Sequence, residues 1–257
     1  MADSQEQTQA FLESLPELGA EESFVFDCNP RVACFNRCCR ELTLPLTPYD
    51  VLRLRACLHM SGEDFLRTYT QVRTFPDTGF PLPLLQMRGG SDGPCPFVTE
   101  AGCGVYADRP GACRTYPLGR GTKIGEKGEV AERFFLVHEE HCQGFVAGRT
   151  WTAHEWMREQ GLADYNASND RYMRLMAMVK ASGEPISSRM ANMCVLAFYQ
   201  CDAFAEFLTS TPVLEKVSLT EERRKAIMAD EAARLEFAFD WVELVLFDQC
   251  PTLQRAS

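Results

Sequence analysis

The sequence has neither a long hydrophobic run nor a leader-like start. No segment approaches the ~20 apolar residues that a membrane-spanning helix needs. The first residues lack the basic end and apolar core of a secretory signal. We therefore expect a cytoplasmic protein without a membrane partner. Positive charge is also scarce, since 26 Lys and Arg are set against 36 Asp and Glu, for a net charge of −10. This balance argues against nucleic acid as a partner, and leaves a protein or small-molecule partner unidentified.

Histidine and local catalytic motifs are also sparse. The chain has four histidines, and no glycine-rich loop stands between an expected strand and an expected helix, as a self-contained methyltransferase would require. Neither a Ser-His-Asp arrangement nor a paired-carboxylate site has a distinctive local signature. Whether the protein is an enzyme is therefore left open by the sequence.

Cysteine, in contrast, is abundant and clustered. Nine of the twelve cysteines lie between residues 28 and 142, and eight of these nine are the candidate metal ligands: Cys28, Cys34, Cys38, Cys39, Cys95, Cys103, Cys113 and Cys142. In a reducing compartment disulfides are disfavoured, so clustered thiols favour metal or iron–sulfur ligation, because soft sulfur selects zinc, copper or iron. A disulfide framework is the alternative if the protein is exported.

The spacing within the first cysteine group is irregular. Five residues separate Cys28 from Cys34, three separate Cys34 from Cys38, and Cys39 follows Cys38 directly. Adjacent side chains point in different directions and rarely reach one small ion together. The pair therefore indicates a cluster or two metals, or one cysteine that does not ligate. His141 precedes Cys142 and could complete a coordination sphere.

The remaining cysteines have a simpler interpretation. A single cysteine is more often an inert buried thiol than a ligand. We interpret four cysteines in this way, two of which lie seven residues apart in an expected helix: Cys57, Cys194, Cys201 and Cys250.

The patterns around these cysteines predict an α+β fold that is mostly α-helical. We expect an N-terminal segment (1–23), a loop-rich cysteine region with short strands (24–149), and a helical C-terminal region (150–257) packed against it. Expected helix starts are Thr47-Pro48, Ser61 with Asp64, and Thr152 with Glu155. Further helices are expected over 169–180, 188–208 and 230–247. Residues 81–87 look extended, and 120–138 read as a hairpin around 125–128.

At the cysteine groups and their flanking residues the sequence resembles the YkgJ family of cysteine-cluster proteins, described as zinc- or iron-chelating. The resemblance rests on Cys38-Cys39-Arg40 with 46–50, on 95–97, on 103–117, and on Cys142 with Gly144. Many members have shorter gaps in the first cysteine group. Flagellin lysine-N-methylase carries a similar cluster, so the resemblance implies that some relatives are protein-modifying enzymes.

The candidate ligands are compatible with either an iron–sulfur cluster or zinc. Zinc sites usually pair their cysteines at short spacing, and only Cys34 and Cys38 show that pattern. Iron–sulfur clusters tolerate irregular spacing because their metal atoms are spread over several ångströms. We favour an iron–sulfur centre, or iron, with a redox or substrate-activating role. The alternatives are a structural zinc protein with a helical partner-binding region and an enzyme similar to the lysine methylase.

Overall fold

The computed structural model describes residues 16–19, 21–124 and 130–256. The chain divides into two compact units, each assembled from separate stretches of sequence. The first comprises residues 1–40, 97–104 and 111–164, and the second comprises 41–96, 105–110 and 165–257. The cysteine-rich stretch thus contributes to both units. In the part of the chain that is described, no helix is long and apolar enough to cross a membrane.

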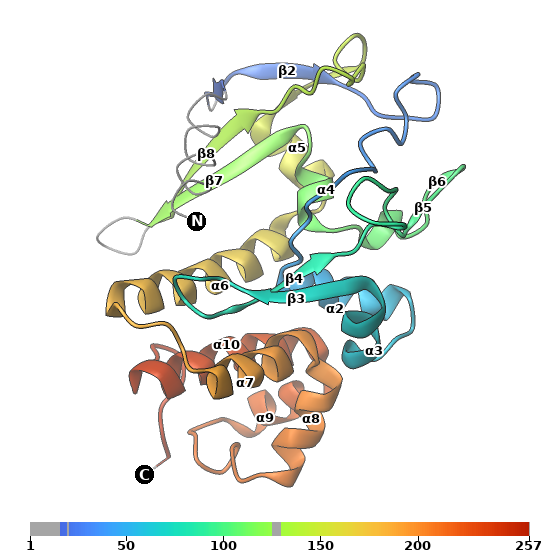
Figure 1. Ribbon diagram of the computed structural model, residues 1–257. Coiled ribbons are helices and arrows are strands. Elements are labelled where there is room, and N and C mark those ends of the chain that lie inside the picture. Colours follow the sequence, from blue (N-terminus) through green and yellow to red (C-terminus); the bar gives the residue numbers. More distant parts are fainter. Residues whose placement is uncertain (1–15, 20, 125–129, 257) are drawn as a thin grey trace. The chain divides into compact units, whose positions relative to one another are not determined.

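Small antiparallel sheets form the frame of the first unit. Strand β2 (Ser23–Phe26) pairs with β9 (Arg149–Thr152), and β1 (Glu17–Leu18), β8 (Val130–Leu136) and β7 (Leu118–Ile124) form a three-stranded sheet in that order. Strands β7 and β8 run side by side (Figure 1), which confirms the expected hairpin. Its expected turn at 125–128 lies outside the described residues. A short ladder of β5 (Val98–Thr99) and β6 (Gly102–Cys103) completes the strands.

An aromatic cluster forms the core beneath β2 and β9. The ring of Phe26 packs edge-on against Trp156 at 5.5 Å and against Tyr116 at 5.9 Å, measured between ring centroids. Trp156 comes from α5 (Ala153–Glu159), which begins with the expected capping box of Thr152 and Glu155. The indole of Trp156 donates to the carbonyl oxygen of Thr115 in α4 (Gly111–Thr115), at 3.0 Å. Edge-on aromatic packing and these bonds fix the directions of the rings.

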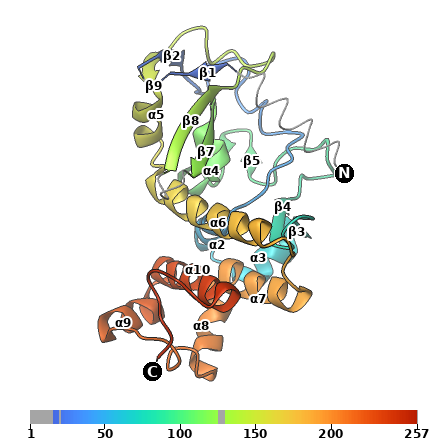
Figure 2. The same cartoon turned by 90° about the vertical axis from the view of Figure 1, so that its left-hand side faces the viewer.

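The second unit is mostly helical. Its elements are α2 (Pro48–Cys57), α3 (Gly62–Tyr69), β3 (Thr70–Thr74), β4 (Pro81–Leu85), the 3₁₀ turn η1 (Tyr106–Asp108), most of α6 (Ala163–Ser182), α7 (Ser188–Tyr199), α8 (Cys201–Ser210), α9 (Glu221–Ala229) and α10 (Glu231–Phe247). Strands β3 and β4 form a hairpin. Figure 2 shows α10 beside α7, and their residues are in contact. This composition confirms the α+β, mostly helical class.

Local signals predicted most helix starts in this unit. Thr47 and Asp50 form a capping box at α2, and Ser61 accepts a hydrogen bond from the backbone of Asp64 at α3. Asp230 caps α10 in the same way through the backbone N–H of Ala233. The buried face of α6 carries the four residues expected from their helical spacing: Tyr172, Leu175, Met176 and Val179.

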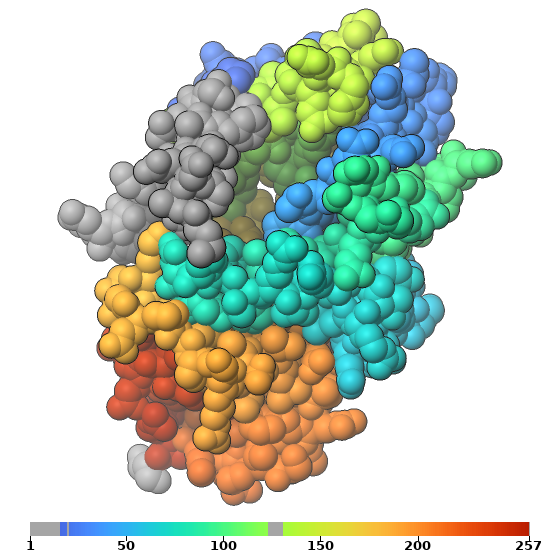
Figure 3. Space-filling view, in the orientation of Figure 1, coloured from blue at the N-terminus to red at the C-terminus, as the bar shows by residue number. Residues whose placement is uncertain are grey.

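The expectation of one helix over 188–208 is wrong. The chain breaks at Gln200, whose φ of −125° and ψ of 56° are not helical, so α7 and α8 are separate helices. Together they form a continuous surface in the space-filling view (Figure 3). The cause is tertiary: the start of α3 packs directly on the break, where a Cβ on Gly62 would lie 2.6 Å from Cα of Gln200. Asp202 also accepts a bond from N–H of Gly62 at 3.1 Å.

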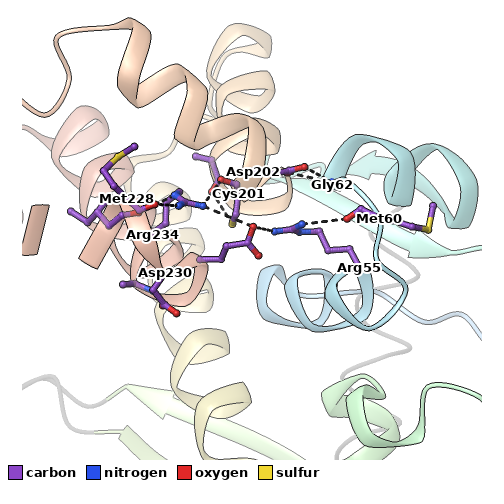
Figure 4. A network of polar contacts seen from close by, with 12 residues as sticks. Arg55, Met60, Gly62, Cys201, Asp202, Met228, Asp230 and Arg234 are labelled. Atoms are coloured by element: carbon purple, nitrogen blue, oxygen red, sulfur yellow. Dashed lines mark hydrogen bonds and ion pairs between the residues drawn. The ribbon is translucent and has the colours of Figure 1, made fainter. Parts of the chain in front are cut away.

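Two buried arginines hold this region together (Figure 4). Arg234 of α10 donates to the carbonyl oxygens of Ile227 and Met228 at the end of α9, and to that of Cys201 at the start of α8. Arg55 of α2 donates to the carbonyl oxygen of Met60 at 3.3 Å. Because the last carbonyl groups of a helix lack intrahelical donors, the Arg234 contacts cap the end of α9 and connect it to the start of α8.

Candidate metal centre

The first cysteine group lies on a chain of consecutive turns. Backbone N–H groups at residues 32, 35, 37 and 39 each donate to the carbonyl oxygen three residues earlier, at 2.9–3.1 Å. The side chain of Asn29 starts this series by accepting from N–H of Arg31 at 2.9 Å. Asn36 continues it in the left-handed region with φ of 67°, which asparagine tolerates better than most residues. The backbone therefore winds tightly between Cys28 and Cys39.

A second turn returns to the first group near Cys142. N–H of Cys142 donates to the carbonyl oxygen of Glu139 at 2.8 Å, and N–H of Asp27 donates to that of Gly144 at 2.9 Å. The approach at Gly144 is close, since a Cβ there would lie 2.5 Å from Cε2 of Phe26 and 3.0 Å from the carbonyl oxygen of Asp27. Glycine is therefore required for this turn to dock beside β2.

Four of the eight candidate cysteines line one pocket in the first unit. The pocket is small and partly open to solvent. The cysteines at its wall are Cys28, Cys34, Cys38 and Cys142, and the other lining residues are Phe26, Asp27, Val32, Tyr116, His141 and Gly144. Sulfurs from two distant parts of the sequence are thus brought together. None of the described residues that line it is a lysine or an arginine.

One backbone amide already donates to a pocket sulfur. N–H of Gln143 lies 3.1 Å from Sγ of Cys34, which is buried. Hydrogen bonds of this kind stabilise a sulfur that carries negative charge, and they tune the properties of sulfur-ligated metals. The turn that carries Cys142 therefore supplies both a thiol and a donor to the pocket.

The pocket thiols influence one another's ionisation. The pKa of Cys28 is raised to about 11, first by loss of water around its sulfur and then by the charges of Cys38, Cys34 and Cys142. The pKa of Cys38 is lowered to about 7, first because the thiol of Cys39 forms a hydrogen bond with its sulfur. Several negative sulfurs placed together without a cation repel one another, so a bound positive metal would relieve this repulsion.

The other four candidates occupy different places. Cys39 contacts the sulfur of Cys38, so the adjacent pair contributes one wall residue and one hydrogen-bonding neighbour. Cys103 is in β6, where it pairs with Val98, and Cys113 is exposed on α4. Cys95 is partly buried and belongs to the second unit. Metal ligation by these four stays a prediction.

Three of the cysteines interpreted as inert are buried in the second unit. Cys194 and Cys201 are at most 1% exposed, and burial raises the pKa of each to about 12. Cys250 is also buried, with its sulfur 3.3 Å from the hydroxyl of Thr252. Cys57 is partly exposed at the end of α2. Thiols that stay protonated in apolar surroundings are poor ligands and poor nucleophiles.

The two histidines near Cys142 differ in position. His141 lines the pocket, and its Nε2 lies 3.1 Å from a carboxylate oxygen of Glu139. These two atoms are poorly aligned, so within the described residues this buried nitrogen has no hydrogen-bond partner. The ring of His138 instead packs edge-on against Phe145 at 4.6 Å. His141 is therefore available to the pocket, as its place beside Cys142 suggested.

Sequence reasoning did not identify Tyr116 as a site residue. Its ring lines the pocket, and burial raises the pKa of its hydroxyl well above the ordinary value, with a further contribution from the neighbouring Cys142 thiol. A tyrosine three residues after a cysteine carries no signal for such a role, because α4 and β7 set its direction.

The chemistry of the donors fits a thiophilic metal. Four thiols and an imidazole are ligands for zinc, iron or iron–sulfur clusters, and not for magnesium or calcium. Among the residues that the structure describes, no three such side chains are close enough to hold one metal ion between them. The four sulfurs therefore surround the pocket and do not meet at one point.

Comparison with family models bears directly on this pocket. The model of the CxxCxxCC family, described as a putative zinc- or iron-chelating domain, matches residues 27–143. The resemblance to YkgJ-type cysteine-cluster proteins is thereby confirmed. The matched range of this CxxCxxCC domain contains all eight candidate cysteines, including the four at the pocket. Comparison with curated proteins and with solved structures finds no match.

Proposed function

We propose that the CxxCxxCC domain of this protein holds an iron–sulfur centre at the pocket of Cys28, Cys34, Cys38 and Cys142. The observation that carries the proposal is that four cysteines from two distant parts of the sequence line one pocket. The zinc- or iron-chelating description of the family supports the choice of metals.

The arrangement of the sulfurs favours a cluster over a single ion. A tetrahedral zinc site needs all its sulfurs about 2.3 Å from one point, whereas a cluster spreads its iron atoms and accepts ligands further apart. Four sulfurs that line one pocket, with no three described ligand side chains converging on a single point, match the second case better. Zinc in the same pocket is the alternative, with a structural role.

The proposed role of the centre is electron transfer. An iron–sulfur centre supplies one-electron chemistry when it is bound. The chain would supply four cysteine ligands to such a centre, and the amide of Gln143 donates to Cys34. A closed ligand set favours electron transfer or structure over substrate activation, by the same logic that separates structural from catalytic zinc. The similarity to flagellin lysine-N-methylase stays a prediction.

Metal analysis of protein purified without oxygen tests the proposal. We expect iron, acid-labile sulfide and broad visible absorption in the wild-type protein. Each of the variants Cys28→Ser, Cys34→Ser, Cys38→Ser and Cys142→Ser should lower the iron content, whereas Cys250→Ser, in a buried thiol of the second unit, should not. Colourless protein with stoichiometric zinc would select the structural alternative. Full metal content in all four pocket variants would overturn the ligand assignment.

The same measurement tests the remaining candidates. If Cys39, Cys95, Cys103 or Cys113 ligates a metal, its replacement by serine lowers metal content as far as a pocket variant does. If Cys39 acts only as a hydrogen-bonding neighbour of Cys38, Cys39→Ser keeps the metal, since a hydroxyl replaces the thiol as donor.

A further inference from the structure

The hydroxyl of Tyr116 is a buried polar group at the wall of the cysteine pocket. Its oxygen exposes less than 1 Å² to solvent, and within the described residues it has no complete hydrogen bond. The neighbouring group with which it interacts is the thiol of Cys142. A buried donor without an acceptor is unfavourable, so this hydroxyl points to an acceptor that the pocket gains when it is filled.

The ring direction of Tyr116 is set by packing and is independent of the hydroxyl. The ring lies edge-on to Phe26, with centroids 5.9 Å apart and planes at 74°. On one side of Tyr116 the carbonyl of Thr115 is held by the indole of Trp156, and on the other Leu118 starts β7 at 3% exposure. None of these contacts involves the hydroxyl oxygen of Tyr116. Phenylalanine can therefore replace Tyr116 without displacing the residues that line the pocket.

The charge of the pocket makes a neutral donor useful. Its described lining contains Asp27 and four thiols but no lysine or arginine, so hydrogen bonds must offset the negative charge of ligating thiolates. The amide of Gln143 serves Cys34 in this way. A thiolate that binds a metal keeps lone pairs for such bonds, and a tyrosine is an O–H donor at neutral pH.

We propose that Tyr116 donates a hydrogen bond to the thiolate of Cys142 when the pocket holds its metal centre, and thereby tunes and retains that centre. Tyr116 is a positioning residue and not a ligand. The inference rests on the proposed metal binding, and it assigns to the loaded pocket two hydrogen-bonded sulfurs, at Cys34 and Cys142. Its chemical basis is that a donor withdraws electron density from a thiolate and lowers its tendency to be protonated and lost.

The test compares wild-type protein with Tyr116→Phe, both purified without oxygen. The variant should bind the same amount of metal, but a competing chelator should remove that metal at about a tenfold lower concentration, since outer-shell partners contribute about 10–100-fold to metal affinity. If the metal is iron, the reduction potential should also move to a more negative value, because the thiolate becomes more electron-rich.

A second tyrosine separates this effect from a general loss of stability. Tyr172→Phe removes a buried hydroxyl that donates to the carbonyl oxygen of Pro81 in the second unit, so it should lower the melting temperature without changing potential or chelator resistance. Equal potential and equal chelator resistance in wild type and Tyr116→Phe would overturn the role of Tyr116 alone. Wild-type protein that holds no metal would overturn the proposed function as well.

Discussion

The two units of this protein treat their buried polar groups differently. In the second unit, two buried carboxylates of α10 have charged partners within the fold: Asp240 pairs with Arg171 and Arg223, and Glu243 lies 3.2 Å from Arg174. In the first unit, four thiols and the hydroxyl of Tyr116 meet at a pocket whose described lining holds no lysine or arginine. The comparison indicates that the fold itself compensates the charges of these carboxylates in the second unit, whereas the grouped thiols of the first unit would gain such compensation from a bound metal.

The largest expected effect is that removal of the proposed metal increases amide hydrogen exchange in the first unit much more than in the second. Because metal binding and folding are coupled at thiolate sites, we expect a chelator to increase amide hydrogen exchange in β2, β9 and the turns at 29–39 and 139–146. Exchange in α7 and α10, whose core residues Phe198 and Phe239 are at most 1% exposed, should change little. Equal loss of protection in both units would contradict the comparison.

Breaking the ion pairs of Asp240 should destabilise the second unit and leave the metal content of the first unit unchanged. Asp240→Ala leaves Arg171 and Arg223 without their shared carboxylate. Loss of one partner of a buried pair costs about 3–5 kcal/mol. Because both arginines are about a third exposed, we expect the lower end of this range, about 3 kcal/mol, in the free energy of unfolding.

The control for this change is Lys225→Ala, whose side chain is 75% exposed and pairs with Glu221 within α9. It should change stability by less than about 0.5 kcal/mol. Denaturant unfolding measures both variants, and metal content should equal that of wild type in each. A fall in metal content for Asp240→Ala would show that the units depend on each other.

Gly144→Ala should weaken the pocket from within. The new Cβ would meet Phe26 and the backbone of Asp27, so the turn must move and carry Cys142 with it. Overpacking of this kind costs about 1–3 kcal/mol, and we expect lower metal affinity in a chelator titration. Gly119→Ala in β7 is the matched control, because its Cβ would have only ordinary contacts at 3.7 Å. Equal affinity in the two variants would argue against the docking role of Gly144.

The smallest expected effects come from two matched helix caps. Thr47→Ala at α2 and Thr152→Ala at α5 each remove the side chain of a capping box, at a cost of about 1 kcal/mol. Thr152 belongs to the first unit and Thr47 to the second, so hydrogen exchange should report the loss in α5 for one variant and in α2 for the other. Loss of protection in both helices from a single substitution would contradict this independence.

Short-range sequence patterns predicted where several helices start. The features that they failed to predict depend on contacts between residues far apart in the sequence. Thr47, Ser61 and Thr152 each start a helix because a cap needs only a side-chain oxygen and an N–H three residues away. The break at Gln200 was missed because its cause, the start of α3, lies more than a hundred residues earlier. The place of Tyr116 at the pocket was missed because its neighbours there, Phe26 and Cys142, are also far from it in the sequence.

The sequence by itself determined the chemistry of the donors, since eight clustered cysteines supply thiols that suit zinc or iron, and residues 27–143 match the model of a family described as zinc- or iron-chelating. It also determined the helix caps, whose bonds span three residues. Only the tertiary structure decided which sulfurs share a pocket, because Cys142 reaches Cys28, Cys34 and Cys38 through the pairing of β2 with β9 and the close approach at Gly144. Contacts across more than a hundred residues depend on how strands and turns pack, and spacing along the chain does not encode them.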